Sequence, residues 1–215
     1  MLIKGVIFDM DGVLVDSEKF ILEAAMAYLK EQGINTKKED FLPFVGTGED
    51  RFIGGPAEKY GLKLDLVKAK DRTYELYGHM VKGRLQPLPG VFEFINKCRN
   101  KGLKIAVASS ADKIKVLTNL LEIKLLPETF DVIINGLDVK NKKPDPEIFL
   151  KAASKMNLTP ESCLVVEDAV SGVAAAKAAG AKCLALTTTF PKEKLKGADW
   201  FAENLAAAPD KALDW

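Results

Sequence analysis

Between Leu103 and Leu186, short apolar segments alternate with segments of helical periodicity. The apolar segments span residues 103–108, 131–134, 163–166 and 183–186. Strands joined in this way by helices form right-handed βαβ units, which build a parallel sheet covered by helices on both faces. The apolar run of residues 2–8 predicts one more strand of the same sheet. The predicted fold class is therefore α/β, with a doubly wound, Rossmann-like parallel sheet.

The segment that follows the first strand is predicted to be helical. Its helical pattern begins at Ser17, a residue type that caps helices, and a turn-rich junction at Pro87 ends the segment. The simplest assembly joins residues 1–14 and 86–215 in one sheet domain, with residues 15–85 inserted as a smaller helical domain. The aromatic residues of the insertion are expected to form its core: Phe41, Phe44, Phe52 and Tyr60.

The composition excludes several classes of protein. Lys and Arg number 31 against 30 Asp and Glu, so the chain lacks the basic excess of most nucleic-acid and membrane-surface binders. No apolar stretch approaches the roughly 20 residues that cross a bilayer, and the N-terminus lacks a secretory signal. Cys98, Cys163 and Cys183 form no CxxC motif, which fits a reducing compartment. We expect a cytoplasmic protein without nucleic-acid or membrane partners, either a monomer or a weak homo-oligomer.

Two acids follow the first predicted strand. Asp9 and Asp11 share one side of the backbone, because alternate residues of a strand share a face. Like charges held this close are costly unless a cation or a shared proton separates them, so the pair implies a metal ion, acid/base chemistry or both. A calcium loop starts with the same residues, but Val13 and Phe20 stand where it needs oxygen ligands. A solvated turn is the remaining structural alternative.

Three more predicted strands end in polar residues. Ser109 and Ser110 follow the second strand, Lys143 lies in the loop after the third, and Glu167 and Asp168 follow the fourth. Taken alone, Ser109 could cap a helix and Lys143 could be a solvated surface residue. Together with the first pair, however, these residues offer carboxylates for a cation, a hydroxyl and amides for an anion, and one ammonium group. That set suits phosphoryl transfer.

In order and approximate spacing, these motifs resemble the four motifs of the haloacid dehalogenase-like superfamily. The resemblance covers almost the whole chain and is greatest to the group of β-phosphoglucomutases and phosphoglycolate phosphatases. It implies a core sheet domain with a small helical cap inserted after the first strand. The matching motifs are Asp9-x-Asp11-Gly12, Ser109, Lys143-Pro144 and Glu167-Asp168.

The resemblance implies roles for the first two acids. Asp9 would attack phosphorus and form an aspartyl-phosphate, and Asp11 would protonate the leaving oxygen and then deprotonate the incoming water or hydroxyl. True haloacid dehalogenases displace halide with a lone aspartate and without magnesium. Asp11 and the acidic pair at residues 167–168 have no role in that chemistry, so phosphoryl transfer is favoured.

The resemblance also implies a cofactor, Mg²⁺, and a phosphate site. The metal would be held by the Asp9 carboxylate, the Asp11 carbonyl and Asp168, with Glu167 as a ligand or as support for one. Ser109, with the amide of Ser110 or Met10, would hold phosphate oxygens, and Lys143 would offset the charge on Asp9 and on the phosphoryl group.

Residues of the insertion decide whether water or a sugar hydroxyl receives the phosphoryl group. β-Phosphoglucomutases typically carry a histidine where this chain has Ile21, and a basic residue where it has Gly48. We expect substrate contacts from Gly46, Gly48 and Arg51, although an arginine near a helix start is more often solvated. The single histidine, His79, shows no orienting partner in the sequence. These departures favour a phosphatase of a small phosphorylated metabolite such as a sugar phosphate, with a β-phosphoglucomutase-type phosphohexomutase as the alternative.

Two non-enzymatic functions share parts of this pattern. Response-regulator receiver domains use aspartates, a hydroxyl, a lysine and Mg²⁺ as a phosphorylation switch. They usually begin with adjacent acids, however, whereas Asp9 and Asp11 are separated by one residue. A catalytically degenerate member that only binds a metabolite would keep the same motifs, and this alternative stays open.

Overall fold

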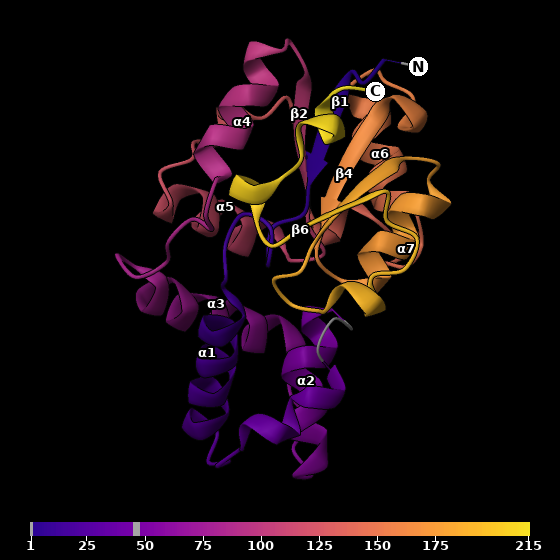
Figure 1. Ribbon diagram of the computed structural model, residues 1–215. Coiled ribbons are helices and arrows are strands. Elements are labelled where there is room, and N and C mark those ends of the chain that lie inside the picture. The colour runs from indigo at the N-terminus through magenta and orange to yellow at the C-terminus, as the bar shows by residue number, and fades with distance from the viewer. Residues whose placement is uncertain (1, 45–47) are drawn as a thin grey trace.

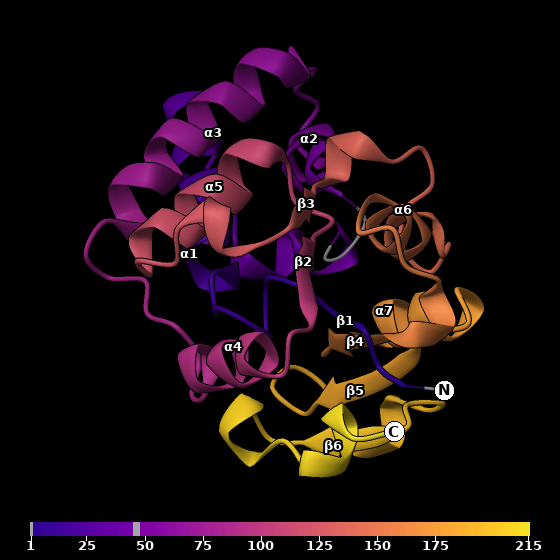
Figure 2. The same ribbon diagram turned by 90° about the horizontal axis from the view of Figure 1, so that it is seen from above.

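A computed structural model describes residues 2–44 and 48–215, and these residues contain a six-stranded sheet. All pairings are parallel, and the strands lie in the order β3-β2-β1-β4-β5-β6 (Figure 2). The predicted α/β class with a doubly wound parallel sheet is confirmed. The strands are Gly5–Phe8 (β1), Lys104–Ala108 (β2), Val132–Ile134 (β3), Cys163–Glu167 (β4), Lys182–Leu186 (β5) and Trp200–Ala202 (β6).

Helices cover both faces of the sheet, as the near-continuous apolar strands require. The side chains of β1 alternate between the faces: Phe8 joins a buried cluster with Phe94, whereas Ile7 joins a second cluster with Phe149 on the other side. The helices are α4 (Val91–Asn100) and α5 (Lys113–Glu122) on one face, and α6 (Glu147–Lys155) and α7 (Val170–Ala178) on the other (Figure 2).

The strand β6 was not predicted from the sequence. It is three residues long and only partly buried, so it shows neither an apolar run nor a period that would reveal a strand. Its pairing with β5 extends the sheet at one edge. Short 3₁₀ helices occupy several connections: Lys38–Asp40, Leu42–Phe44, Pro127–Thr129, Gly136–Asp138, Pro160–Ser162, Lys192–Lys194, Leu205–Ala207 and Asp210–Leu213.

Three helices form a separate layer beyond the carboxyl ends of the strands (Figure 1). This layer has its own buried cluster, which includes Leu29, Phe41 and Ile53. Tyr77 and Val81 of α3 lie outside that cluster and pack into the core on the α4–α5 face of the sheet. The layer is therefore both internally packed and seated against the sheet. Its helices are α1 (Glu18–Glu31), α2 (Glu49–Lys59) and α3 (Leu66–Val81).

The chain passes between the sheet and this helical layer at two adjacent places. Val15, on the way out, forms an isolated antiparallel bridge with Pro87, on the way back. Beside it, the amide of Leu88 donates a hydrogen bond to the carbonyl of Leu14 at 2.9 Å. The two connecting segments are thus bound to each other.

A pair of glycine substitutions tests how the C-terminal segment packs on α4. Gly33 and Gly90 both have φ of +83°, but a Cβ on Gly33 would meet nothing within 4 Å, whereas one on Gly90 would lie 2.0 Å from the amide nitrogen of Ala206. We expect Gly33→Ala to cost about 1–2 kcal/mol of stability through backbone strain alone. Gly90→Ala should cost about 1–3 kcal/mol more because the backbone of residue 206 must move. Urea denaturation of both variants checks this, and equal losses would contradict the described packing.

Candidate active site

The strand register brings the predicted strand ends to one edge of the sheet. Phe8 lies level with Val107 of β2 and Val166 of β4, so the residues that follow these three strands emerge side by side. Asp9 continues β1 in register, because its amide donates to the carbonyl of Val166 at 3.0 Å. The register therefore gathers residues that lie more than 150 positions apart in the sequence.

Lys143 bridges two of the buried acids at this edge. Its Nζ atom lies 2.5 Å from Asp9 Oδ1 and 2.6 Å from Glu167 Oε1, and its side chain is only 7% exposed. Burial lowers the pKa of Lys143, but the attraction of the two carboxylates outweighs it, so the net shift is upward. Lys143 is therefore held as a buried cation between Asp9 and Glu167.

Glu167 is fixed by the backbone as well as by Lys143. Its Oε2 atom accepts hydrogen bonds from the amides of Asp168 and Ala169, both at 2.8 Å. A Cβ on Gly172 would lie 1.8 Å from Glu167 Oε1, so the small residue of α7 leaves room for this carboxylate. Glu167 thus has a fixed orientation before any ligand binds.

The two aspartates beside this pair carry incompletely compensated charge. Burial, opposed by Lys143, raises the pKa of Asp9 from 3.8 to about 7. Burial and the neighbouring charge of Glu167 raise the pKa of Asp168 to about 8, and Asp168 forms no ion pair with a residue of the described chain. Raised pKa values mean that the ionised forms of both groups lack a sufficient positive partner here.

The donor set fits a hard divalent cation. In the described part of the chain no three His, Cys, Asp or Glu side chains form a ready-made metal cluster. Mg²⁺ does not need one, because it typically takes one or two carboxylates together with waters and a phosphate oxygen. Asp9 and Asp168 are two such carboxylates, and their raised pKa values show that added positive charge would favour their ionised forms.

Asp11 lies in a different set of contacts from Asp9. Its Oδ2 atom is 2.7 Å from Nζ of Lys115 on α5, and the hydroxyl of Ser17 donates to its Oδ1 atom. Asn119 donates to the Ser17 hydroxyl at 3.4 Å and accepts a hydrogen bond from the phenol of Tyr77. Ser17 was expected to cap α1, and it occupies the N-cap position, but its hydroxyl bonds Asp11 and no amide of the helix.

Ser109 and Ser110 follow β2 at the same edge. Ser109 is buried, and its hydroxyl accepts a hydrogen bond from the amide of Ala111 at 3.2 Å. The helix α5 begins only at Lys113, with Asp112 at its N-cap, so Ser109 is not the cap of that helix. Ser110 is partly exposed and lines the cavity described next.

A cavity of about 840 Å³ lies between the strand ends and the helical layer. Polar residues from the sheet side form one wall, and they include all the core residues singled out from the sequence. Much of the opposite wall is apolar and comes from the helical layer. Phe41, Phe44 and Phe52, predicted to be core residues, all line the cavity, although Phe41 is also buried in the layer's own cluster.

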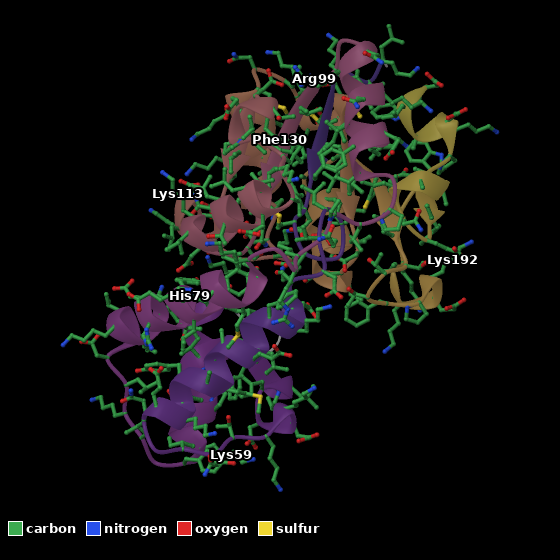
Figure 3. All side chains as sticks on the ribbon, turned by 90° about the vertical axis from the view of Figure 1, so that its left-hand side faces the viewer. Lys59, His79, Arg99, Lys113, Phe130 and Lys192 are labelled. Carbon is green, nitrogen blue, oxygen red and sulfur yellow. The ribbon has the colours of Figure 1, made fainter. Side chains whose placement is uncertain are left out.

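The residues predicted in the insertion have different positions. Gly48 lines the cavity, as does Ile21, and Gly46 lies outside the described residues. Arg51 is not among the residues that line the cavity. It pairs with Glu58 at 3.0 Å, where both side chains are more than half exposed. His79 is exposed on α3 (Figure 3), and it is not among the residues that line the cavity.

Several cavity residues were missed from the sequence. Thr189 and Phe190 line the cavity after β5, and Thr189 acts on Asp168 by opposing the rise of its pKa. Lys115 and Glu49 come from two different helices and reach the same space. Spacing along the chain does not reveal the burial of Lys115, because consecutive residues such as Lys115 and Val116 lie about 100° apart on a helix.

Fold and site together define an α/β protein of the Rossmann-like type, in which polar residues at one edge of the sheet face a cavity under a helical layer. The family model of haloacid dehalogenase-like hydrolases matches residues 6–186, and the chain belongs to this family. The family predicted from the motifs is thus confirmed.

Individual relatives cover different parts of this chain. It is 43% identical over 202 residues to the Arabidopsis thaliana protein SUPPRESSOR OF QUENCHING 1, chloroplastic. The matched region covers 91% of this chain but only 19% of the length of that protein. It is 36% identical to the phosphorylated carbohydrates phosphatase of Thermotoga maritima, with 82% of each chain covered. The crystal structure of CbbY from Rhodobacter sphaeroides in complex with phosphate superposes with a TM-score of 0.87 at 25% identity and covers 100% of both chains. None of the described helices is long and apolar enough to cross a bilayer.

The pKa of Asp168 predicts a pH-dependent stability. Its folded-state pKa of about 8 lies above the ordinary 3.8, so the folded protein holds this proton more tightly than the unfolded chain. Without divalent cations, ionising Asp168 therefore destabilises the protein increasingly as pH rises from about 4 to about 8. Asp168→Asn should be more stable relative to wild type at pH 8 than at pH 4, as measured by urea denaturation in EDTA.

A second aspartate supplies a control of opposite sign. Lys177 and Lys182 donate to Asp199, and although burial opposes them, its pKa is lowered. The stability that Asp199 contributes is therefore present above its unfolded-state pKa and lost as pH falls. Asp199→Asn should lose stability relative to wild type at neutral pH. A same-sign pH trend for both variants would contradict the charge distribution described for the site.

Proposed function

We propose that the protein is a Mg²⁺-dependent phosphatase that hydrolyses a small phosphorylated metabolite, with sugar phosphates as the first candidates. The observation that carries this proposal is the convergence of Asp9, Lys143, Glu167 and Asp168 at one end of the sheet, beside a cavity of about 840 Å³. An in-line attack on phosphorus needs a nucleophile, a cation and donors for the oxygens, and these residues supply that chemistry.

The roles we assign follow from these contacts. Asp9 is the nucleophile that forms an aspartyl-phosphate, and Lys143 offsets the charge on Asp9 and on the incoming phosphoryl group. Ser109 and the amide of Ser110 hold phosphate oxygens. Asp11 delivers a proton to the leaving oxygen and then removes one from the attacking water.

Mg²⁺ would be held by Asp9, by the backbone carbonyl of Asp11 and by Asp168, with Glu167 supporting it from behind. When bound, it would lower the repulsion between the anionic ester and the carboxylates and orient the phosphate. Gly12 belongs to this arrangement, because a Cβ there would lie 1.8 Å from Asp168 Oδ2 and its φ is +74°.

We also propose a division of the chain into two domains. Residues 1–14 and 86–215 would form the core that carries the chemistry, and residues 15–85 would form a cap that covers the substrate. The separate buried cluster of the helical layer and its attachment through two adjacent segments support this division. Closure of the cap over the cavity would exclude bulk water during phosphoryl transfer.

We prefer phosphatase activity to mutase activity because of the residues that the helical layer contributes to the cavity. A phosphohexomutase needs a group that activates a sugar hydroxyl as the acceptor of the phosphoryl group. The β-phosphoglucomutases that this chain resembles typically carry a histidine in the corresponding cap helix. Ile21 stands at that place and lines the cavity, and no histidine lines it within the described residues. The Thermotoga maritima relative, named a phosphorylated carbohydrates phosphatase, supports the same choice of reaction and substrate class.

Replacing the nucleophile is the direct test of this function. Asp9→Asn should remove hydrolysis of p-nitrophenyl phosphate with Mg²⁺, by at least about 10³-fold, because an amide cannot attack phosphorus. EDTA should abolish wild-type activity, and added Mg²⁺ should restore it. Asp145→Asn, a change of the same kind outside the cavity lining, is the matched control and should keep activity. An inactive wild type across a panel of phospho-metabolites would instead favour a binding module.

A phosphosugar panel separates the two enzymatic alternatives. With β-glucose 1-phosphate and other sugar phosphates, we expect release of inorganic phosphate and no isomerised sugar phosphate, because Ile21 offers no proton acceptor. Phosphate release and product identity can be measured in the same reaction. Accumulation of glucose 6-phosphate without loss of total ester phosphate would contradict the phosphatase assignment and support the mutase.

A further inference from the structure

Lys115 is a buried cation that the proposed chemistry has not yet used. Its side chain is only 5% exposed, and its Nζ atom lies 2.7 Å from Asp11 Oδ2. The Asp11 side chain is 21% exposed, and both residues line the cavity, with Lys115 the more deeply buried of the two. Burying an ammonium group costs several kcal/mol unless a partner offsets the cost, and Asp11 is that partner.

The helix α5 is built to hold this cation. Four of its residues are buried, and they form one stripe at helical spacing: Lys115, Val116, Asn119 and Leu120. The apolar half, Val116 and Leu120, belongs to the core on this face of the sheet. The polar half, Lys115 and Asn119, is one turn apart and faces the contacts around Asp11.

The other oxygen of Asp11 is held from the helical layer. Ser17, at the start of α1, donates to Asp11 Oδ1, and Asn119 donates to Ser17 at 3.4 Å. Tyr77 of α3 donates in turn to Asn119. Asp11 is thus held on both oxygens, by the sheet domain's helix on one side and by the inserted helices on the other.

A second carboxylate also acts on Lys115. Burial lowers the pKa of Lys115, but the attraction of Asp11 and of Glu49 on α2 outweighs it, so the net shift is upward. The carboxylate of Asp11 lies at hydrogen-bond distance from the ammonium group, and this contact is what orients Asp11.

We propose that Lys115 is a positioning residue that fixes the Asp11 carboxylate for proton transfer to and from the substrate oxygen. This inference rests on the proposed function, because it gives Lys115 a role within that reaction. Each carboxylate oxygen keeps a second lone pair, on which Asp11 carries the proton that passes to the leaving oxygen and that it regains from the attacking water, so the contact with Lys115 does not block Asp11. Lys115 itself acts through Asp11 and not on the substrate.

The test exploits the different needs of two leaving groups. p-Nitrophenolate leaves without needing a proton, whereas an alkoxide must be protonated as its bond to phosphorus breaks. The value of kcat/KM covers the steps up to departure of the leaving group. Loss of a well-placed acid should therefore lower kcat/KM for alkyl phosphates and spare it for p-nitrophenyl phosphate.

We expect Lys115→Met to lower kcat/KM on the order of 10²-fold for an alkyl phosphate that the wild type hydrolyses, since a small misplacement of a proton donor has effects of this size. With p-nitrophenyl phosphate, kcat/KM should stay near the wild-type value. Lys115→Arg keeps a cation that can reach Asp11 and should recover part of the lost activity. Asp11→Asn should show the same selectivity, with a larger loss.

Lys113→Met is the matched control, because Lys113 is on the same helix but exposed (Figure 3). It should leave both substrates unaffected. Equal losses of Lys115→Met on both substrates would show a merely structural role, and no loss on either would show that Asp11 needs no such support. Both outcomes overturn the inference while wild-type activity stands. An inactive wild type would instead refute the proposed function itself.

Discussion

The contact of Lys143 with Asp9 and Glu167 is the interaction on which the rest of the site depends. Three carboxylates crowd at the carboxyl end of β1 and β4, and one ammonium, almost fully withdrawn from solvent, lies between two of them. Such an ion pair is costly to bury, so its geometry must be well defined and its remaining bonds satisfied. The amides of Asp168 and Ala169 meet that need for Glu167. The charge on Asp9 and Asp168 is left without a sufficient positive partner, and this is where we propose that Mg²⁺ binds.

The sheet explains why these groups can meet at all. β1 occupies a central place in the strand order, so residues that leave it find neighbours from β2 on one side and β4 on the other. Asp9 therefore follows a strand that lies between β2, which is followed by Ser109, and β4, which ends at Glu167. Small residues nearby make the packing possible, because Gly12 and Gly172 leave space that the carboxylates of Asp168 and Glu167 fill.

Much of this arrangement could be predicted from the sequence, for physical reasons. Strands buried on both faces read as apolar runs, and their carboxyl ends were visible as changes to Asp, Ser and Glu. β6 could not be predicted, because three half-buried edge residues leave no pattern. The contact of Ser17 with Asp11 and the burial of Lys115 were missed for another reason: both depend on how α1 and α5 approach the strand ends, and spacing along the chain carries no such information. The cavity-facing aromatics, such as Phe44, were missed because an apolar residue looks the same in a core and in a cavity wall.

The bound pair of connecting segments at Val15 and Pro87 has a mechanical consequence. Because both crossings occur at one point, any rotation of the three inserted helices turns about that point, and displacement grows with distance from it. Ser17 and Ile21 sit close to the pivot and would barely shift. Lys59, at the end of α2 and on the side of the helical layer away from the sheet (Figure 3), would move further. Such leverage would let the cavity between the two layers widen while the contact of Ser17 with Asp11 keeps its alignment.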